Sequence, residues 1–357
     1  MDKTDPARRK GRAATYNPAN RFDRLTAVAE GDGWDIAEDL PPLRTEVSVE
    51  VPKSVITRNT SPDVPFDRSI NPYRGCEHGC IYCFARPSHA FLGLSAGLDF
   101  ETKLIARPDA PLVLRKELAK PSYRVAPIAI GTNTDPYQPI EKTRGVMRAL
   151  LRELADHRHP VGIVTKGTLI ERDIDILREM AADGLVKVGI SVTTLDPLTA
   201  RAMEPRVPHP ARRLQTIERL AEAGIPVRVM AAPMIPALTD HELEAILKAG
   251  AEAGARAASY IVLRLPREVA PLFTDWLREA FPLRAERVMA RVRELHGGQD
   301  YDPEFGKRMT GQGKWAELLR QRFNIARQRY GLARELPDMR CDLFRVPPRA
   351  GDQLSLF

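Results

Sequence analysis

Between residues 66 and 265, short apolar runs alternate with amphipathic stretches of helical length. The runs are rich in Val and Ile, and they lie at 128–130, 161–164, 186–192, 227–230 and 258–263. The stretches between and after them carry apolar residues at helical spacing, which predicts helices near 144–156, 172–182, 197–203, 211–223 and 240–253. Continuous β-branched runs that alternate with amphipathic helices indicate a parallel sheet covered by helices.

A further strand is expected just before a cysteine-rich loop at 76–83, which brings the number of βα units to six. A closed barrel of this kind has eight units. The prediction is therefore an α/β fold, an open partial (βα)6 TIM-type barrel with an N-terminal extension and a C-terminal helical region. Chemistry in such barrels takes place at the carboxyl ends of the strands. Polar residues gather there, at 131–135, at 165–167 and at 191–194.

The chain divides into four predicted parts. Residues 1–65 are an N-terminal extension with strand-like alternation at 46–58, and 66–265 form the barrel core. Residues 266–345 form a C-terminal helical region, and 346–357 a flexible tail. The basic run at 8–12 predicts a solvated, disordered segment, with phosphate contact as the alternative. Thr239 and Glu242 have the spacing of a capping box, which predicts a helix start there.

Composition excludes several classes of protein. With 43% hydrophobic residues in a chain of 357, a substantial core can form. No apolar stretch is long enough for a membrane-spanning helix, and the polar N-terminus has no apolar segment of a secretory signal. Four cysteines, three of them in one loop, argue against a disulfide framework. We therefore expect a soluble, cytoplasmic protein, and its net charge of +7 is compatible with nucleic-acid contact.

The loop Cys-Glu-His-Gly-Cys-Ile-Tyr-Cys carries thiols at 76, 80 and 83. Such thiols can converge on one centre if the backbone wraps around it, and Gly75 and Gly79 supply the freedom for that. Soft thiolates select zinc, Cu(I) or an iron–sulfur cluster. A structural zinc site needs four ligands, which His78 or Cys341 could complete. Three ligands on a cubane cluster instead leave one iron open to an exogenous ligand.

The C-x3-C-x2-C spacing, with Tyr82 just before Cys83, resembles the signature of the radical S-adenosylmethionine (SAM) superfamily. The segments 69–75, 84–89, 132–141 and 164–167 are similar to its DNA repair photolyase-like group, which is related to spore photoproduct lyase. The resemblance covers roughly residues 66–265 and includes the open (βα)6 barrel. It implies a [4Fe–4S] cluster whose open iron binds SAM, and reductive cleavage of SAM to a 5′-deoxyadenosyl radical.

The resemblance also implies roles for individual residues. Cys76, Cys80 and Cys83 bind iron, and the backbone near Tyr82 contacts the adenine. The segment after the second strand, with Thr132, Asn133 and Asp135, contacts the methionine end of SAM, and Lys166 and Ser191 contact its carboxylate or ribose. This sequence departs from the family pattern in two places. The usual Gly-Gly-Glu after the second strand is replaced by Gly-Thr-Asn-Thr-Asp, and the fifth strand lacks the glycine-rich adenine motif.

His89 and Cys341 are the candidate catalytic side chains outside this set. His89 follows the cysteine loop and could act as an acid or a base, although a lone histidine is more often structural. Cys341 is the remaining thiol, and the lyase relatives use a thiol as hydrogen-atom donor. Its position far downstream breaks the analogy, and a buried inert thiol is the alternative.

The C-terminus carries a second signal. A linker rich in Pro and Gly ends in Gln353, Leu354, Ser355, Leu356 and Phe357. This pentapeptide resembles the Q-L-S/D-L-F pattern by which bacterial polymerases and repair proteins bind the DNA sliding clamp. The two leucines and Phe357 would enter an apolar groove, and Gln353 would make a directional hydrogen bond. The alternative is a tail that folds back onto its own chain.

These observations lead to three hypotheses. The first is a radical SAM enzyme that acts on DNA, as a lyase-like lesion repair enzyme recruited by the clamp and reduced by a flavodoxin- or ferredoxin-like donor. The second keeps the radical chemistry but changes the substrate to RNA or a protein side chain. The third is a non-catalytic, metal-stabilised adaptor on the clamp.

Overall fold

The computed structural model describes residues 3–23, 41–333 and 335–348. Its strands are β1 Glu46–Val49, β2 Thr57–Arg58, β3 Arg68–Ile70, β4 Tyr73–Arg74, β5 Lys103–Ala106, β6 Ile128–Ile130, β7 Val161–Thr165, β8 Val186–Ser191, β9 Val227–Met234 and β10 Ala257–Val262. Its α-helices are α1 Leu98–Thr102, α2 Ala110–Leu118, α3 Glu141–Arg144, α4 Val146–Asp156, α5 Ile174–Ala182, α6 Pro197–Met203, α7 Pro210–Glu222, α8 Leu243–Glu252, α9 Val269–Ala280, α10 Ala285–Leu295 and α11 Gly313–Arg329. Short 3-10 helices are η1 Arg86–Leu92, η2 Thr168–Asp173 and η3 Asp240–Glu242.

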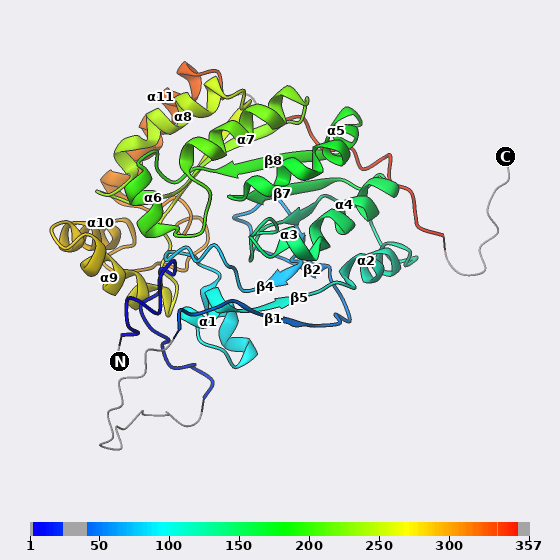
Figure 1. Cartoon of the computed structure of the whole chain (residues 1–357). Coiled ribbons are helices and arrows are strands. Elements are labelled where there is room, and N and C mark those ends of the chain that lie inside the picture. The colour runs from blue at the N-terminus through cyan, green and yellow to red at the C-terminus, as the bar shows by residue number, and fades with distance from the viewer. Residues whose placement is uncertain (1–2, 24–40, 334, 349–357) are drawn as a thin grey trace.

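The main sheet has the strand order β10-β9-β8-β7-β6-β3-β2 within the described residues. Every neighbouring pair from β3 to β10 is parallel, and β2 pairs antiparallel to β3 at the edge. The open (βα)6 barrel expected from the sequence is therefore confirmed, with β3 as the strand that leads to the cysteine loop. Figure 1 shows this sheet with helices α3, α4, α5 and α7 along it.

The main core forms on the sheet because buried apolar residues of neighbouring strands are paired with one another. Ile130, Ile163, Val188 and Val227 are partners across β6 to β9, and each is at most 1% exposed. Helices α4, α5, α7 and α8 add apolar residues to the same core. A continuous row of β-branched and leucine-like side chains is what a parallel sheet under helices requires. The strand ends are thereby fixed relative to one another.

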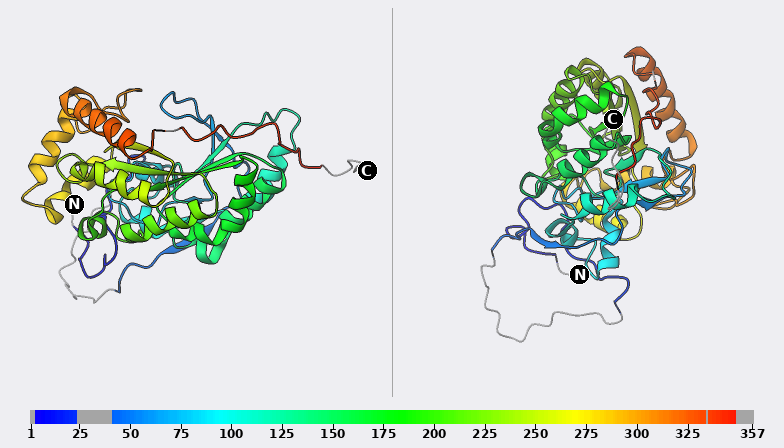
Figure 2. Two further views of the ribbon diagram at one scale, coloured as in Figure 1. Left: turned by 90° about the horizontal axis from the view of Figure 1, so that it is seen from above. Right: turned by 90° about the vertical axis from the view of Figure 1, so that its right-hand side faces the viewer.

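The C-terminal region lies on the other face of the sheet. Figure 2 shows α11, in orange, and the red segment after it on the opposite side from the green helices. Phe323 of α11 packs against Tyr260 of β10, with ring centroids 4.7 Å apart and ring planes tilted by 50°. The segment 335–348 then crosses the amino ends of the strands, where the Arg340 N–H donates to the Gly184 carbonyl and the Arg345 N–H to that of His157.

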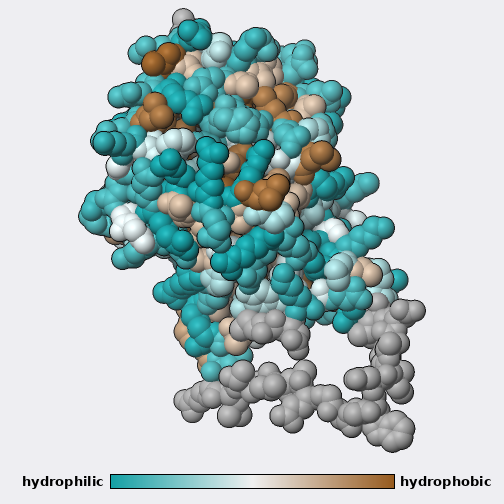
Figure 3. Space-filling view, turned by 90° about the vertical axis from the view of Figure 1, so that its left-hand side faces the viewer, coloured by the Kyte–Doolittle hydropathy of each residue, from teal (hydrophilic) through white to brown (hydrophobic). Residues whose placement is uncertain are grey.

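A smaller sheet, in the order β1-β5-β4, supports the cysteine loop. The strand-like stretch predicted at 46–58 is thus divided: β1 joins this small sheet, and β2 joins the main one. A second core forms beside the loop, where Ile81 packs with Phe273 and Trp276 of α9 and with α10. The outer face that carries α9 and α10 is largely hydrophilic, with separate hydrophobic spots (Figure 3).

The solvated segment predicted at 8–12 is wrong for the residues described there. Arg9 forms an ion pair with Glu279 of α9, and Arg12 is buried with its guanidinium donating to the Glu101 carbonyl at 2.7 Å. Ala13 and Ala14 follow in full burial. This segment is ordered by carboxylate and carbonyl partners that lie elsewhere in the chain. A count of charges within the segment cannot predict such partners. Among the described helices, none is both long and apolar enough to cross a membrane.

Candidate functional site

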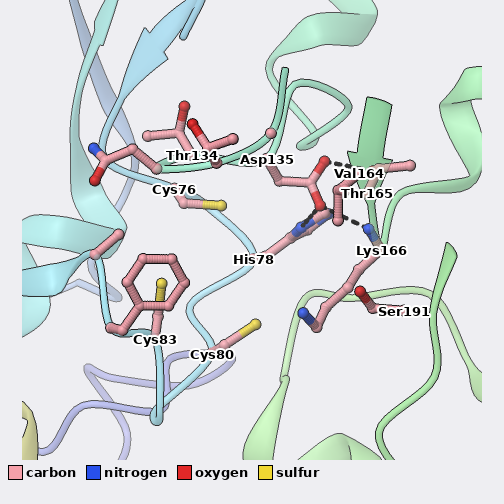
Figure 4. A pocket seen from close by; sticks show the side chains of 15 residues that line it. Cys76, His78, Cys80, Cys83, Thr134, Asp135, Val164, Thr165, Lys166 and Ser191 are labelled. Atoms are coloured by element: carbon pink, nitrogen blue, oxygen red, sulfur yellow. Dashed lines mark hydrogen bonds and ion pairs between the residues drawn. The ribbon is translucent and has the colours of Figure 1, made fainter. Parts of the chain in front are cut away.

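Three consecutive strands of the barrel end at one pocket. Its walls come from the cysteine loop and from the segments that follow β6, β7 and β8 (Figure 4). The lining residues are Cys76, His78, Cys80, Cys83, Phe84, Ala85, Gly131, Thr132, Asn133, Thr134, Asp135, Val164, Thr165, Lys166 and Ser191. The pocket is open on one side, and its empty volume, which includes space open to solvent, is about 510 Å³.

The cysteine loop is shaped by backbone hydrogen bonds and two glycines. The Cys76 N–H donates to the carbonyl of Phe100 in α1, and the Ile81 N–H donates to the carbonyl of Met203 in α6. These bonds attach the loop to both helices. Gly75 and Gly79 have φ of 74° and 66°, a conformation that favours glycine. A Cβ on Gly79 would lie 2.7 Å from a carboxylate oxygen of Glu101. The fold therefore requires glycine at this turn.

Arg86 fixes the loop from behind. All five of its hydrogen bonds lie in the interior: to the carbonyls of Cys80, Gly79, Ala96 and Gly97, and to the Glu101 carboxylate at 2.6 Å. Both side chains are 0% exposed. The Glu101 carboxylate also accepts the N–H groups of Ala13 and Ala14 at 2.9–3.1 Å. Two segments distant in sequence thus meet at one buried ion pair beneath the cysteines.

The three sulfurs of the loop lie on one side of the pocket (Figure 4). Burial raises the pKa of the Cys76 and Cys80 thiols, so these thiols hold their protons until a metal displaces them. The donor set of three soft thiols facing open space fits an iron–sulfur cluster. No three His, Cys, Asp or Glu side chains of the described residues converge on a single metal ion.

The other side of the pocket carries Asp135, Lys166 and Ser191 (Figure 4). The Asp135 carboxylate accepts from the Thr165 hydroxyl at 2.6 Å and from the Lys166 N–H at 2.8 Å. It also pairs with His78 Nδ1 at 3.3 Å. Burial alone would raise the pKa of Asp135, but His78 and the hydrogen bonds lower it to about 2. The carboxylate therefore stays ionised in the pocket wall.

Lys166 keeps its charge despite its burial. Burial lowers its pKa, but opposite charges nearby, among them the carboxylates of Glu204 and Asp135, outweigh that effect and raise it. The ammonium also lies 5.7 Å from the centroid of the Tyr82 ring. A charged lysine beside three thiols is suited to a carboxylate ligand. Thr132, Asn133 and Ser191 add neutral hydrogen-bonding groups to the same space.

Sequence reasoning missed a buried group beneath Tyr82. The Tyr82 hydroxyl donates to the Glu204 carboxylate, which also accepts from Thr193 at 2.8 Å and pairs with Arg213 at 2.9 Å. Glu204 follows α6 at a position where the sequence shows only the end of a helix. No local pattern marks it, because its partners come from three other elements. The group holds the Tyr82 ring in one orientation.

Two candidate catalytic residues lie outside the pocket. His89 is 0% exposed, its Nε2 lies 2.9 Å from the Lys103 carbonyl, and its ring meets Phe100 edge-on. Burial lowers its pKa. Cys341 is half-buried in the segment at the amino ends of the strands. The residues Gln353 to Phe357 lie outside the described residues.

The chain was compared with protein-family models, curated proteins and solved structures. The family model of the radical SAM superfamily matches residues 70–249. An uncharacterised protein of Mycobacterium tuberculosis is 37% identical over 272 residues, which cover 76% of each chain. One from Methanocaldococcus jannaschii is 27% identical over 173 residues, 48% of this chain and 62% of that one.

Among solved structures, the fold is similar to that of spore photoproduct lyase complexed with dinucleoside spore photoproduct. The TM-score is 0.56 at 13% identity, and the match covers 80% of this chain and 79% of the lyase. A mutant of the lyase with bound AdoMet and the same dinucleoside gives a TM-score of 0.54 at 14% identity, over 80% and 78% of the two chains. At these identities the likeness concerns the fold.

Proposed function

The chain belongs to the radical SAM superfamily, and we propose that it is a radical SAM enzyme whose substrate is a nucleic acid, with a DNA lesion as the target. Enzymes of this superfamily use a [4Fe–4S] cluster and SAM. One observation carries the enzymatic part of the proposal: three cysteines face Asp135 and Lys166 across a pocket at the carboxyl ends of the strands.

Each side of the pocket has a task in this proposal. Cys76, Cys80 and Cys83 would hold the cluster, which would supply the electron for reductive cleavage of SAM to a 5′-deoxyadenosyl radical. Lys166 offers a positive charge to the SAM carboxylate, and Ser191 a hydroxyl to the carboxylate or ribose. Thr132, Asn133 and Asp135 surround the methionine end. Tyr82, fixed by Glu204, holds the backbone that meets the adenine.

Two alternatives to the cluster are disfavoured by the surroundings of the thiols. His78, which could complete a zinc site, faces the carboxylate of Asp135 at 3.3 Å. Cys341, the other possible fourth ligand, is not among the residues that line the pocket. A cluster would need neither of them, because the three thiols of the loop would hold it and leave one position for SAM.

The choice of DNA rests on likeness and on charge. One solved structure of similar fold is spore photoproduct lyase complexed with dinucleoside spore photoproduct. The chain also carries a formal net charge of +7, which favours a polyanionic partner. We propose a flavodoxin- or ferredoxin-like protein as the electron donor, because the cluster must be reduced by one electron before each cleavage.

Ultraviolet-damaged DNA is expected to stimulate 5′-deoxyadenosine formation by the protein. Anaerobic reconstitution with iron and sulfide, followed by chemical reduction, would be assayed with damaged DNA, intact DNA and no DNA. A substrate that gives a hydrogen atom to the radical makes SAM cleavage irreversible. Formation of 5′-deoxyadenosine should therefore rise with damaged DNA and not with intact DNA. Product indifferent to DNA would move the substrate to RNA or a protein side chain. No product, with one tightly held zinc ion, would favour a non-catalytic adaptor.

We further propose that Gln353 to Phe357 bind the bacterial sliding clamp. Removal of 349–357, or the double change Leu356→Ala and Phe357→Ala, should weaken clamp binding at least about 30-fold, since apolar anchors of this kind contribute about 2 kcal/mol or more. Pull-down and surface plasmon resonance with purified clamp would measure it. Asp352→Ala, just outside the pentapeptide, is the control. Clamp binding that survives the deletion would contradict the proposal, and SAM cleavage should be equal in all variants.

A further inference from the structure

Phe84 is an exposed aromatic residue at the mouth of the pocket. It directly follows Cys83, lines the pocket and is 44% exposed. A single exposed phenylalanine on a protein surface is ordinary. This one differs because it lies on the same wall as the cysteines and has a guanidinium over its ring.

Arg264 covers the Phe84 ring. Its Cζ lies 4.5 Å from the ring centroid, within the range of a cation–π contact. Arg264 follows β10 at its carboxyl end, and its side chain also donates to the sulfur of Met309 at 3.1 Å. Burial lowers the pKa of Arg264, and the nearby Tyr301 hydroxyl and Asp63 carboxylate act against that effect. The Phe84 ring is therefore one of several neighbours that hold this guanidinium in place.

The loop that carries Met309 is itself anchored across the open side of the barrel. The Met309 carbonyl accepts from the Val262 N–H at 3.0 Å. Arg308 pairs with Asp63 and donates to Ser61 at 2.6 Å, and both partners belong to the connection between β2 and β3. The two edges of the main sheet are thus joined at the mouth, and Arg264 is held in a fixed position over Phe84.

We propose that Phe84 is a stacking platform for an unpaired nucleobase of the substrate, at the entrance to the pocket. This deepens the proposed function and rests on it. One ring face is covered by a fixed guanidinium, so the other is the surface on which a planar base can stack. Aromatic side chains beside basic groups are the usual platform for single-stranded nucleic acid, and stacking on them tolerates any base. A fixed ring also loses little conformational entropy when a base arrives.

The adenine of SAM is the other planar ring that could occupy this position. The two sources are separated by measuring two affinities on the same variants. The reconstituted protein would be titrated anaerobically with a fluorescein-labelled single-stranded oligothymidylate, followed by anisotropy. Binding of radiolabelled SAM would be followed by equilibrium dialysis.

Phe84→Leu keeps the apolar volume and removes the ring. We expect it to weaken oligonucleotide binding about tenfold or more, and Phe84→Trp to bind at least as tightly as the wild type. Phe305→Leu is the matched control: Phe305 is 54% exposed and lies under Arg308 at 4.6 Å, but it does not line the pocket. Its oligonucleotide affinity should stay within twofold of the wild type.

Equal oligonucleotide affinity of Phe84→Leu and the wild type would overturn the proposal. So would a loss of SAM affinity in Phe84→Leu with oligonucleotide binding intact, which would assign the ring to the adenine. If Phe84→Leu does not take up iron, the test falls on Phe84→Trp alone. Weaker oligonucleotide binding by Phe84→Trp than by the wild type would then overturn the proposal. A wild type that binds no oligonucleotide would instead overturn the nucleic-acid substrate itself, which distinguishes the two failures.

Discussion

Replacement of Cys83 with alanine is expected to abolish formation of 5′-deoxyadenosine from SAM. Cys83 is one of three thiols on one wall of the pocket, and two thiols hold a cubane cluster poorly because a second iron becomes open to water. The reconstituted variant should show less iron and sulfide, weak cluster absorbance and a rate at the background of the assay. Cys76→Ala and Cys80→Ala should behave in the same way.

Cys341→Ala is the matched control, since Cys341 is the remaining cysteine and lies at the opposite ends of the strands. Its cluster content and its SAM cleavage should equal those of the wild type. Full SAM cleavage by Cys83→Ala would contradict the assignment of the cluster ligands. Loss of cluster in Cys341→Ala would mean that the fourth thiol is a ligand, and would revive the zinc alternative.

Replacement of Arg86 with methionine is expected to lower the free energy of unfolding by about 3–5 kcal/mol, the usual cost of breaking a buried ion pair. The change leaves the Glu101 carboxylate without its cation and deprives the carbonyls of Gly79 and Cys80 of their donor. The loop that carries the cysteines should loosen first. Anaerobic urea unfolding, followed by circular dichroism and by cluster absorbance, would measure both effects.

Arg340→Met provides the comparison on the surface. Arg340 pairs with Asp342 at 2.6 Å, but both side chains are more than half exposed, and such pairs contribute little to stability because water screens the two charges. Equal destabilisation by the two substitutions would show that the network around Arg86 does not hold the loop. A stable Arg86→Met protein with normal cluster content would lead to the same conclusion.

The barrel could be predicted from the sequence because its signals are local. Each buried strand is a β-branched run of its own, and the polar residues that follow β6, β7 and β8 lie next to those runs in the chain. Parallel strands bring their carboxyl ends to one edge. Asp135, Lys166 and Ser191 could therefore be expected near one another, and the structure places them in one pocket.

Contacts between distant segments could not be predicted in this way. The helix start expected at Thr239 is confirmed, since Thr239 is the N-cap of η3, but the capping-box hydrogen bonds are not made. The Thr239 hydroxyl accepts from the Ile235 N–H, and Glu242 accepts from Thr194 and from the Leu195 N–H after β8. The spacing suits a cap, but the carboxylate has better partners in another element. The contact between Glu204 and Tyr82 could not be predicted either. The two residues are far apart in the sequence, so no repeating pattern of residues marks the pair.

The position of the segment 335–348 at the amino ends of the strands sets the direction in which the protein can be tethered. The pocket lies at the other ends of the same strands. A partner bound through the proposed clamp-binding pentapeptide would therefore approach from the side of the amino ends and leave the pocket entrance free for DNA.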